Sequence, residues 1–156
     1  MRHPTASLRL MQGFTMVELV IVIVLLGILS VTVLPRLSGS NEFRIVQLRD
    51  EVAAALRFAQ KTAVSHRRNV CISVAGDVLA LQIADAHPAN GCNQTLSIPG
   101  GAATVSVPGV SLSVTPATLV IQPSGQVTGN NSQKYEFLIG GGEYKLTLWA
   151  ETGHVE

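Results

Sequence analysis

The sequence predicts an α+β protein, in which a long N-terminal α-helix with a membrane-spanning first half packs on a C-terminal antiparallel β domain. Residues 14–34 are apolar on every side of a helix, with a single charge at Glu18. Apolar residues then recur at helical spacing as far as His66, and beyond Arg68 the period changes to the two-residue alternation of strands. These changes divide the chain into four parts, at residues 1–13, 14–37, 38–68 and 69–156.

The apolar segment has the length of a membrane span. Phe14 to Leu34 is 21 residues long, and a helix of that length extends roughly 30 Å, the thickness of the hydrocarbon core of a bilayer. A carboxylate such as Glu18 near the end of a membrane helix costs about 2.5–3.5 kcal/mol, so it needs a partner or a function. Cleavage after Gly13 would supply a partner, because Phe14 would then carry a free α-amino group.

These residues carry a family resemblance. The sequence Gly13-Phe14-Thr15-Met16-Val17-Glu18, followed by an apolar segment and a proline, resembles the class III signal of type IV prepilins and type II secretion pseudopilins. The resemblance implies that a prepilin peptidase cuts between Gly13 and Phe14 and methylates Phe14, and that Glu18 aligns each incoming subunit in the filament. An uncut membrane anchor and a secretory signal are the alternatives, although the apolar region of a secretory signal covers only about 7–15 residues.

The first 13 residues, MRHPTASLRLMQG, are the predicted leader peptide. Their positive charge, from Arg2 and Arg9, keeps that end cytoplasmic and sends the C-terminal domain across the membrane. The resemblance places the protein in the bacterial inner membrane with a periplasmic domain, and then in a pilus or pseudopilus. The partners it implies are the prepilin peptidase, other pilin or pseudopilin subunits, the inner-membrane assembly platform and the lipid bilayer.

Gly27 and Pro35 are the weak points of the predicted anchor. Glycine in a helix interior costs about 1 kcal/mol relative to alanine, and proline removes a backbone hydrogen bond, so we expect a bend. In the resembled family the segment between a glycine and a proline at such positions is often unwound, and a simple kink is the alternative.

A second helix is predicted from Glu42 to about His66, after a polar break at residues 38–41. Its apolar positions are Ile45, Leu48, Val52, Ala55, Leu56, Ala59 and Ala63, which share one face. The other face carries Arg49, Arg57, Lys61 and Arg68. Some members of the resembled family take up DNA, so this row raises a DNA-binding alternative. A charged helix face is more often simply solvated, and no aromatic residues interleave with this one for base stacking.

Short strands and turns fill the C-terminal half. The expected strands cover residues 69–74, 78–84, 95–98, 103–107, 110–114, 119–122, 134–139 and 143–150. In the last two strands Tyr135, Phe137 and Ile139 share one face, as do Tyr144, Leu146, Leu148 and Ala150, so these faces should line the core. Trp149 should point the other way, where it either contacts a partner or is covered by glycine-rich loops, and we favour the loops.

The end of the chain carries a weaker resemblance. A strand leading into Gln122-Pro123-Ser124-Gly125, followed by a hairpin ending in Trp149-Ala150-Glu151-Thr152-Gly153-His154-Val155, resembles the minor pseudopilin H and FimT-type branch of the family, and a minor pilin of the mannose-sensitive haemagglutinin pilus. In the DNA-uptake minor pilins an arginine-containing tail follows the last glycine. Here Gly153 is followed by His154-Val155-Glu156, which weakens the DNA-binding alternative.

Two cysteines, Cys71 and Cys92, are present. A domain outside the reducing cytoplasm favours a disulfide between them, which would contribute roughly 3 kcal/mol in the entropic description. Two buried thiols are the alternative, and a metal site with His87 would lack a fourth ligand. His66, His87 and His154 are scattered and form no catalytic constellation. We therefore expect that the protein is not an enzyme and binds no cofactor or metal. We expect a minor pilin or pseudopilin subunit that is processed by enzymes.

Overall fold

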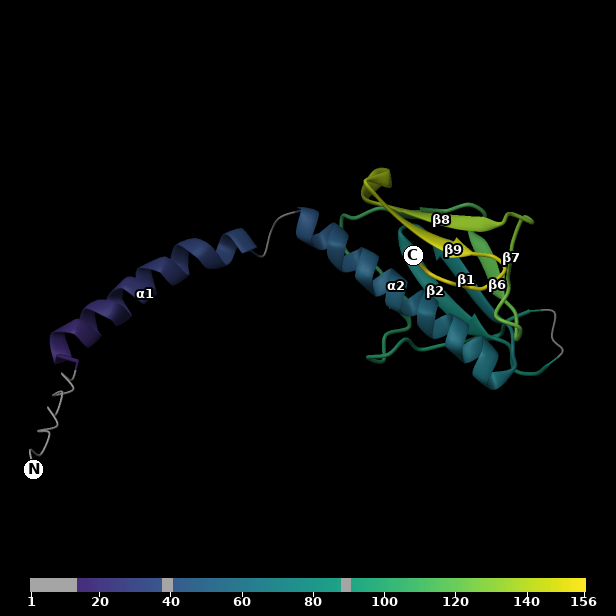
Figure 1. The fold of residues 1–156 in the computed structure, drawn as a ribbon, viewed down its shortest axis with the longest axis horizontal. Helices are drawn as coiled ribbons and strands as arrows, with labels where there is room; N and C mark the ends of the chain where they lie inside the picture. The colour runs from purple at the N-terminus through teal and green to yellow at the C-terminus, as the bar shows by residue number, and fades with distance from the viewer. Residues whose placement is uncertain (1–13, 38–40, 88–90) are drawn as a thin grey trace, which may run out of the picture. The chain divides into compact units, whose positions relative to one another are not determined.

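The computed structural model describes residues 14–37, 41–87 and 91–156, with side chains of residues 31–37 left undescribed. The chain forms two compact units, residues 1–39 and residues 40–156 (Figure 1). The first contains the helix α1 (Met16–Leu37). The second contains α2 (Asn41–His66) and nine strands.

α1 is a helix whose large apolar side chains are exposed on all sides. Its exposed residues include Leu19, Val20 and Ile21 on successive positions, so no single face is buried. Gly27 and Pro35 both lie inside α1, which continues to Leu37, and the bend expected from them stays a prediction. No helix in the described ranges combines the length and the apolarity needed to cross a membrane. The predicted span ends at Leu34, and the side chains of its last residues lie outside the description.

α2 is the amphipathic helix that the spacing predicts, beginning one residue earlier than expected. Its buried residues are Ile45, Leu48, Val52, Ala53, Ala55, Leu56, Ala59, Thr62 and Ala63. The helix ends where Arg67 adopts the left-handed conformation, with φ of 52°. The Arg68 N–H then donates to the carbonyl of Ala63 at 3.2 Å, satisfying an otherwise unpaired carbonyl of the last turn.

The strands form two antiparallel sheets. They are β1 (Val70–Ala75), β2 (Val78–Ile83), β3 (Gln94–Thr95), β4 (Thr104–Val105), β5 (Leu112–Val114), β6 (Thr118–Ile121), β7 (Val127–Thr128), β8 (Lys134–Ile139) and β9 (Tyr144–Trp149). The larger sheet has the order β3-β2-β1-β6-β7, with β4 also paired to β2. The smaller sheet has the order β5-β8-β9. A one-turn 3₁₀ helix, Gly140–Gly142, links β8 to β9.

α2 packs against both sheets and closes the core of the second unit (Figure 1). One hydrophobic cluster joins the buried face of α2 to the inner faces of both sheets. In the smaller sheet Tyr135, Phe137 and Ile139 are buried, as the alternation predicts. Leu146 and Leu148 are also buried, while Tyr144 and Ala150 are half-buried and pack against the cluster.

The strand predictions differ in accuracy along the chain. The β1–β2 hairpin is confirmed, with Gly76 and Asp77 both at positive φ, as a tight two-residue turn requires. β3 and β4 are shorter than predicted, at two residues each. β7 was missed, because a two-residue strand shows no alternation in a polar stretch.

Trp149 lies on the outer face of the smaller sheet and is 40% exposed. The cover by glycine-rich loops that we favoured is therefore wrong. The reason lies in the register: the Gly140–Gly142 turn joins the strands beside the pair Ile139 and Tyr144, whereas Trp149 pairs with Lys134 at the opposite end of the hairpin.

Candidate assembly site

The first turn of α1 is held by a side-chain cap. Thr15 precedes the helix, and its Oγ1 accepts a hydrogen bond from the Glu18 N–H at 3.2 Å. The Thr15 carbonyl accepts the first helical hydrogen bond, from the Leu19 N–H at 3.1 Å. Threonine at the cap with glutamate three residues later is the capping-box pattern. This role of Thr15 was not predicted, although the capping-box signal is present in Thr15-Met16-Val17-Glu18.

Cap geometry places a negative charge at a helix N-terminus. Glu18 lies in the first turn of α1, where the exposed N–H groups carry partial positive charge and favour a carboxylate. Within the described residues its carboxylate has no ion-pair partner. Phe14 is 77% exposed. Gly13, the other side of the predicted cleavage junction, lies outside the described residues. The first turn of α1 is thus ordered by the Thr15 hydroxyl, which bonds the Glu18 N–H and not its carboxylate.

The body of α1 offers neighbours a wholly apolar surface. Its large apolar residues from Met16 to Leu29 are between 42% and 80% exposed. The polar side chain of Ser30 donates its hydroxyl to the Leu26 carbonyl at 2.7 Å, so this group is satisfied within the helix. A helix that is apolar on every side is stable only inside a larger apolar environment. α1 therefore needs cover from lipid or from other helices.

The two C-terminal motifs of the sequence meet in space. Gly125 of the β6–β7 turn and Gly153 of the terminal turn are both at positive φ, and a Cβ on Gly153 would lie 2.6 Å from the Gly125 carbonyl oxygen. α2 binds the same turn, because Gln60 Nε2 donates to the Thr152 carbonyl. The last residues then run back along β9, where the Glu156 N–H donates to the Thr147 carbonyl at 3.0 Å. The contact between glycines locks the tail against the rest of the second unit.

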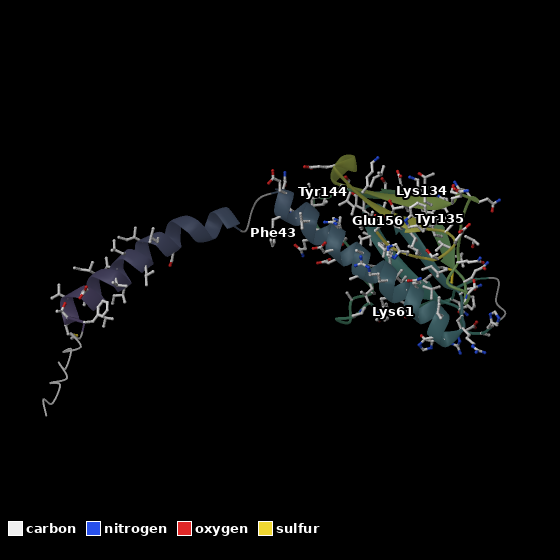
Figure 2. All side chains as sticks on the ribbon, in the orientation of Figure 1. Phe43, Lys61, Lys134, Tyr135, Tyr144 and Glu156 are labelled. Atoms are coloured by element: carbon white, nitrogen blue, oxygen red, sulfur yellow. A yellow bond between two sulfur atoms is a disulfide. The ribbon has the colours of Figure 1, made fainter. Side chains whose placement is uncertain are left out.

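The basic row on α2 is interrupted. Arg57 Nη2 donates to the Val155 carbonyl at 3.3 Å, so this side chain fastens the tail to the helix. Lys61 remains exposed on α2 (Figure 2). Arg67, which the row did not include, is exposed beyond the helix end. The hydrogen bond to Val155 gives Arg57 a structural role.

Cys71 and Cys92 form a disulfide, as predicted. It ties β1 to the segment that follows β2. Among the described residues, no three His, Cys, Asp or Glu side chains are grouped as metal ligands. His66, His87 and His154 are exposed and lie on different elements.

Comparisons with known proteins show one sequence motif and one similarity of fold. Residues 8–34 match the family described as the prokaryotic N-terminal methylation motif. No curated protein matches the chain. The type IV minor pilin FimU of Pseudomonas aeruginosa is similar in structure, with a TM-score of 0.50 and 17% identity over 74% of this chain and 88% of that one.

The minor pseudopilin EpsH from the type 2 secretion system of Vibrio cholerae is also similar, with a TM-score of 0.52 and 12% identity over 72% of this chain and 93% of that one. At these identities the similarity concerns the fold. It confirms the α+β, pilin-like architecture of a helix packed on antiparallel sheets. The chain thus combines a prokaryotic N-terminal methylation motif at residues 8–34 with a fold similar to those of FimU and EpsH.

Proposed function

We propose that this protein is a non-enzymatic minor pilin or pseudopilin subunit. It is inserted in the bacterial inner membrane through residues 14–34, with its domain in the periplasm, and assembles into a type IV pilus or a type II secretion pseudopilus. One observation carries the proposal: a capped helix, with exposed apolar side chains from Met16 to Leu29 and a single acid in its first turn, follows a Gly-Phe junction in the sequence. The methylation motif over the same residues supports it.

The proposed maturation assigns a role to each residue at the junction. A prepilin peptidase cuts between Gly13 and Phe14 and methylates the new amine of Phe14. The Glu18 carboxylate then pairs with the Phe14 amine of a neighbouring subunit as α1 leaves the lipid. Such a pair is strong in an apolar filament core, where the effective dielectric is low. Apolar contacts between α1 helices supply the remaining cohesion.

The N-terminus of the mature protein tests the processing step. Mass spectrometry of the protein purified from cells with a prepilin peptidase should find a chain that begins at a methylated Phe14. An intact Met1 in those cells would overturn the proposal in favour of a plain membrane anchor. Cells without the peptidase provide the control, and there the leader should be retained.

Substitutions at Glu18 separate its charge from its place in the capping box. Glutamine also serves at this position of the box, so Glu18→Gln keeps the cap and removes the charge. Both Glu18→Gln and Glu18→Ala should be cleaved normally and fail to enter filaments. Thr15→Ser, which keeps a capping hydroxyl, is the matched control and should assemble. Normal incorporation of Glu18→Gln would refute the pairing of charges.

The DNA-uptake alternative has weaker support, because Arg57 is held by the tail carbonyl and the tail has no arginine. A mobility-shift titration over a salt series decides it. Genuine phosphate contacts weaken steeply as salt rises.

A further inference from the structure

A small pocket lies beside the exposed Trp149 at the open end of the β8–β9 hairpin. Its volume is about 230 Å³ and it is lined by Gln133, Trp149, Glu151 and Thr152. Lys134, the register partner of Trp149, marks this end of the smaller sheet in Figure 2. The proposed assembly function uses none of these residues. The pocket is smaller than the roughly 300–1,000 Å³ typical of drug-sized ligands, so it suits a single small ring.

Hydrogen bonds hold the backbone that surrounds the pocket. The Ala150 N–H donates to the Gln133 carbonyl at 2.9 Å, which joins the loop before β8 to the end of β9. The Trp149 carbonyl accepts from the Gly153 N–H at 2.8 Å, closing the turn that contains Glu151 and Thr152. Thr152 Oγ1 also accepts from the His154 N–H at 3.2 Å. The backbone around the pocket is therefore ordered before binding, and the remaining entropic cost is the ordering of the exposed Gln133 and Glu151 side chains.

The lining offers an aromatic surface and free polar groups. The Trp149 ring is only partly covered. In the described part of the chain, neither the Gln133 amide nor the Glu151 carboxylate has a side-chain hydrogen-bond partner. A pyranose ring has complementary chemistry, because its C–H groups lie on one side and its hydroxyls around the edge. The C–H side can rest on the indole, and the hydroxyls can bond the amide and the carboxylate.

The surroundings disfavour a large protein interface at this site. Outside the pocket, the same face of the sheet carries the Lys134–Glu136 ion pair, with 2.8 Å between Nζ and Oε1, and the exposed Lys145. Charged residues are depleted from the buried centres of protein interfaces. We propose that this pocket binds one pyranose ring of an uncharged glycan. Glu151 disfavours an acidic sugar at the same place.

Tryptophan fluorescence tests the proposal directly, because the chain contains a single tryptophan. The full-length protein in lauryldimethylamine oxide, a detergent without sugar groups, is titrated with methyl glycosides and oligosaccharides of neutral hexoses and N-acetylhexosamines. A saturable change in intensity or emission maximum is expected for at least one of them, and a weaker response for the matching uronic acid. An unchanged spectrum throughout the neutral series would overturn the proposal.

Calorimetry on variants locates the binding. Trp149→Ala should bind the responding glycan about tenfold more weakly or worse, since it loses the stacking surface. Gln133→Ala should also weaken binding of the glycan, and this variant keeps the exposed Trp149 ring. Gln82→Ala, on an exposed position of β2, and Phe43→Ala, which removes an exposed ring from α2, are the matched controls and should bind normally. Wild-type binding by both pocket variants would refute the site. The site would also be refuted if the wild-type protein bound no glycan and Trp149→Ala crosslinked less to neighbouring subunits, because Trp149 would then be a subunit contact.

Discussion

The two long helices of this chain differ in whether their apolar side chains are buried. α1 has 22 residues and leaves its large apolar side chains from Met16 to Leu29 exposed, whereas α2 has 26 residues and buries four large apolar side chains, Ile45, Leu48, Val52 and Leu56. Burying one such side chain contributes about 1.5–3 kcal/mol, so α2 gains from its own domain what α1 can gain only from lipid or other helices. The second unit buries its apolar core within the chain, whereas the apolar side chains of α1 are not buried by the described residues. The predictions below test that division and the packing of the second unit.

Truncating one leucine in each helix tests the division with the largest effect. Leu56 is fully buried in α2, so Leu56→Ala should lower the free energy of unfolding of the domain by about 2–5 kcal/mol. Leu26→Ala, in the exposed α1, should change it by less than about 0.5 kcal/mol. Urea denaturation followed by Trp149 fluorescence measures both. Equal destabilisation by the two variants would mean that the units do not fold independently.

The disulfide should matter only to the second unit. Cys71 and Cys92 are 21 residues apart, and opening a loop of that length should cost the domain about 3 kcal/mol. Urea denaturation with and without a reductant measures the loss. The double variant Cys71→Ser with Cys92→Ser should resemble the reduced protein and be insensitive to reductant. The circular dichroism of α1 in detergent should stay the same, and its loss on reduction would contradict the division.

The buried hydroxyl of Tyr135 should lower the free energy of unfolding of the domain. Tyr135 is 1% exposed, and in the described structure its hydroxyl is buried without a hydrogen-bond partner. Tyr135→Phe removes that unpaired group and keeps the ring, so it should raise the free energy of unfolding by about 1 kcal/mol. Tyr144→Phe is the matched control. The Tyr144 hydroxyl is not among the buried hydroxyls that lack a hydrogen-bond partner, so its removal should change the free energy of unfolding little. Destabilisation by Tyr135→Phe would instead indicate a hydrogen bond to buried water.

Periodic patterns in the sequence predicted most of the fold. The three-and-four spacing of α2 and the alternation in β8 and β9 each repeat over several residues, and these elements are where the sequence placed them. β7 has two residues and its position depends on pairing with β6, a contact that no local pattern records. Sequence reasoning is therefore strongest where one element buries one continuous face.

The candidate sites divide in the same way. Gly13, Phe14 and Glu18 could be predicted because the proposed cleavage and assembly depend on adjacent residues in one short motif. The link between Arg57 and Val155 joins residues 98 positions apart, and only the folded domain reveals it. Trp149 was placed correctly on the outer face, but its exposure depended on which end of the hairpin carries the turn.

The smallest predicted effect concerns a surface ion pair of the second unit. The hydrogen bond from Lys134, its positive charge and the more distant charge of Lys145 hold the pKa of Glu136 below its usual value. Because the folded pKa is lower than the unfolded one, the pair stabilises the domain at neutral pH, and this contribution disappears as the pH falls through the folded pKa. Glu136→Gln should therefore be slightly less stable than wild type near neutrality and equal to it in acid. Both groups are exposed, so added salt should shrink the difference in stability.

Glu143→Gln, at an exposed glutamate without an ion pair in the described structure, is the control. A pH dependence of its stability as large as that of Glu136→Gln would exclude the Lys134 pair as the cause.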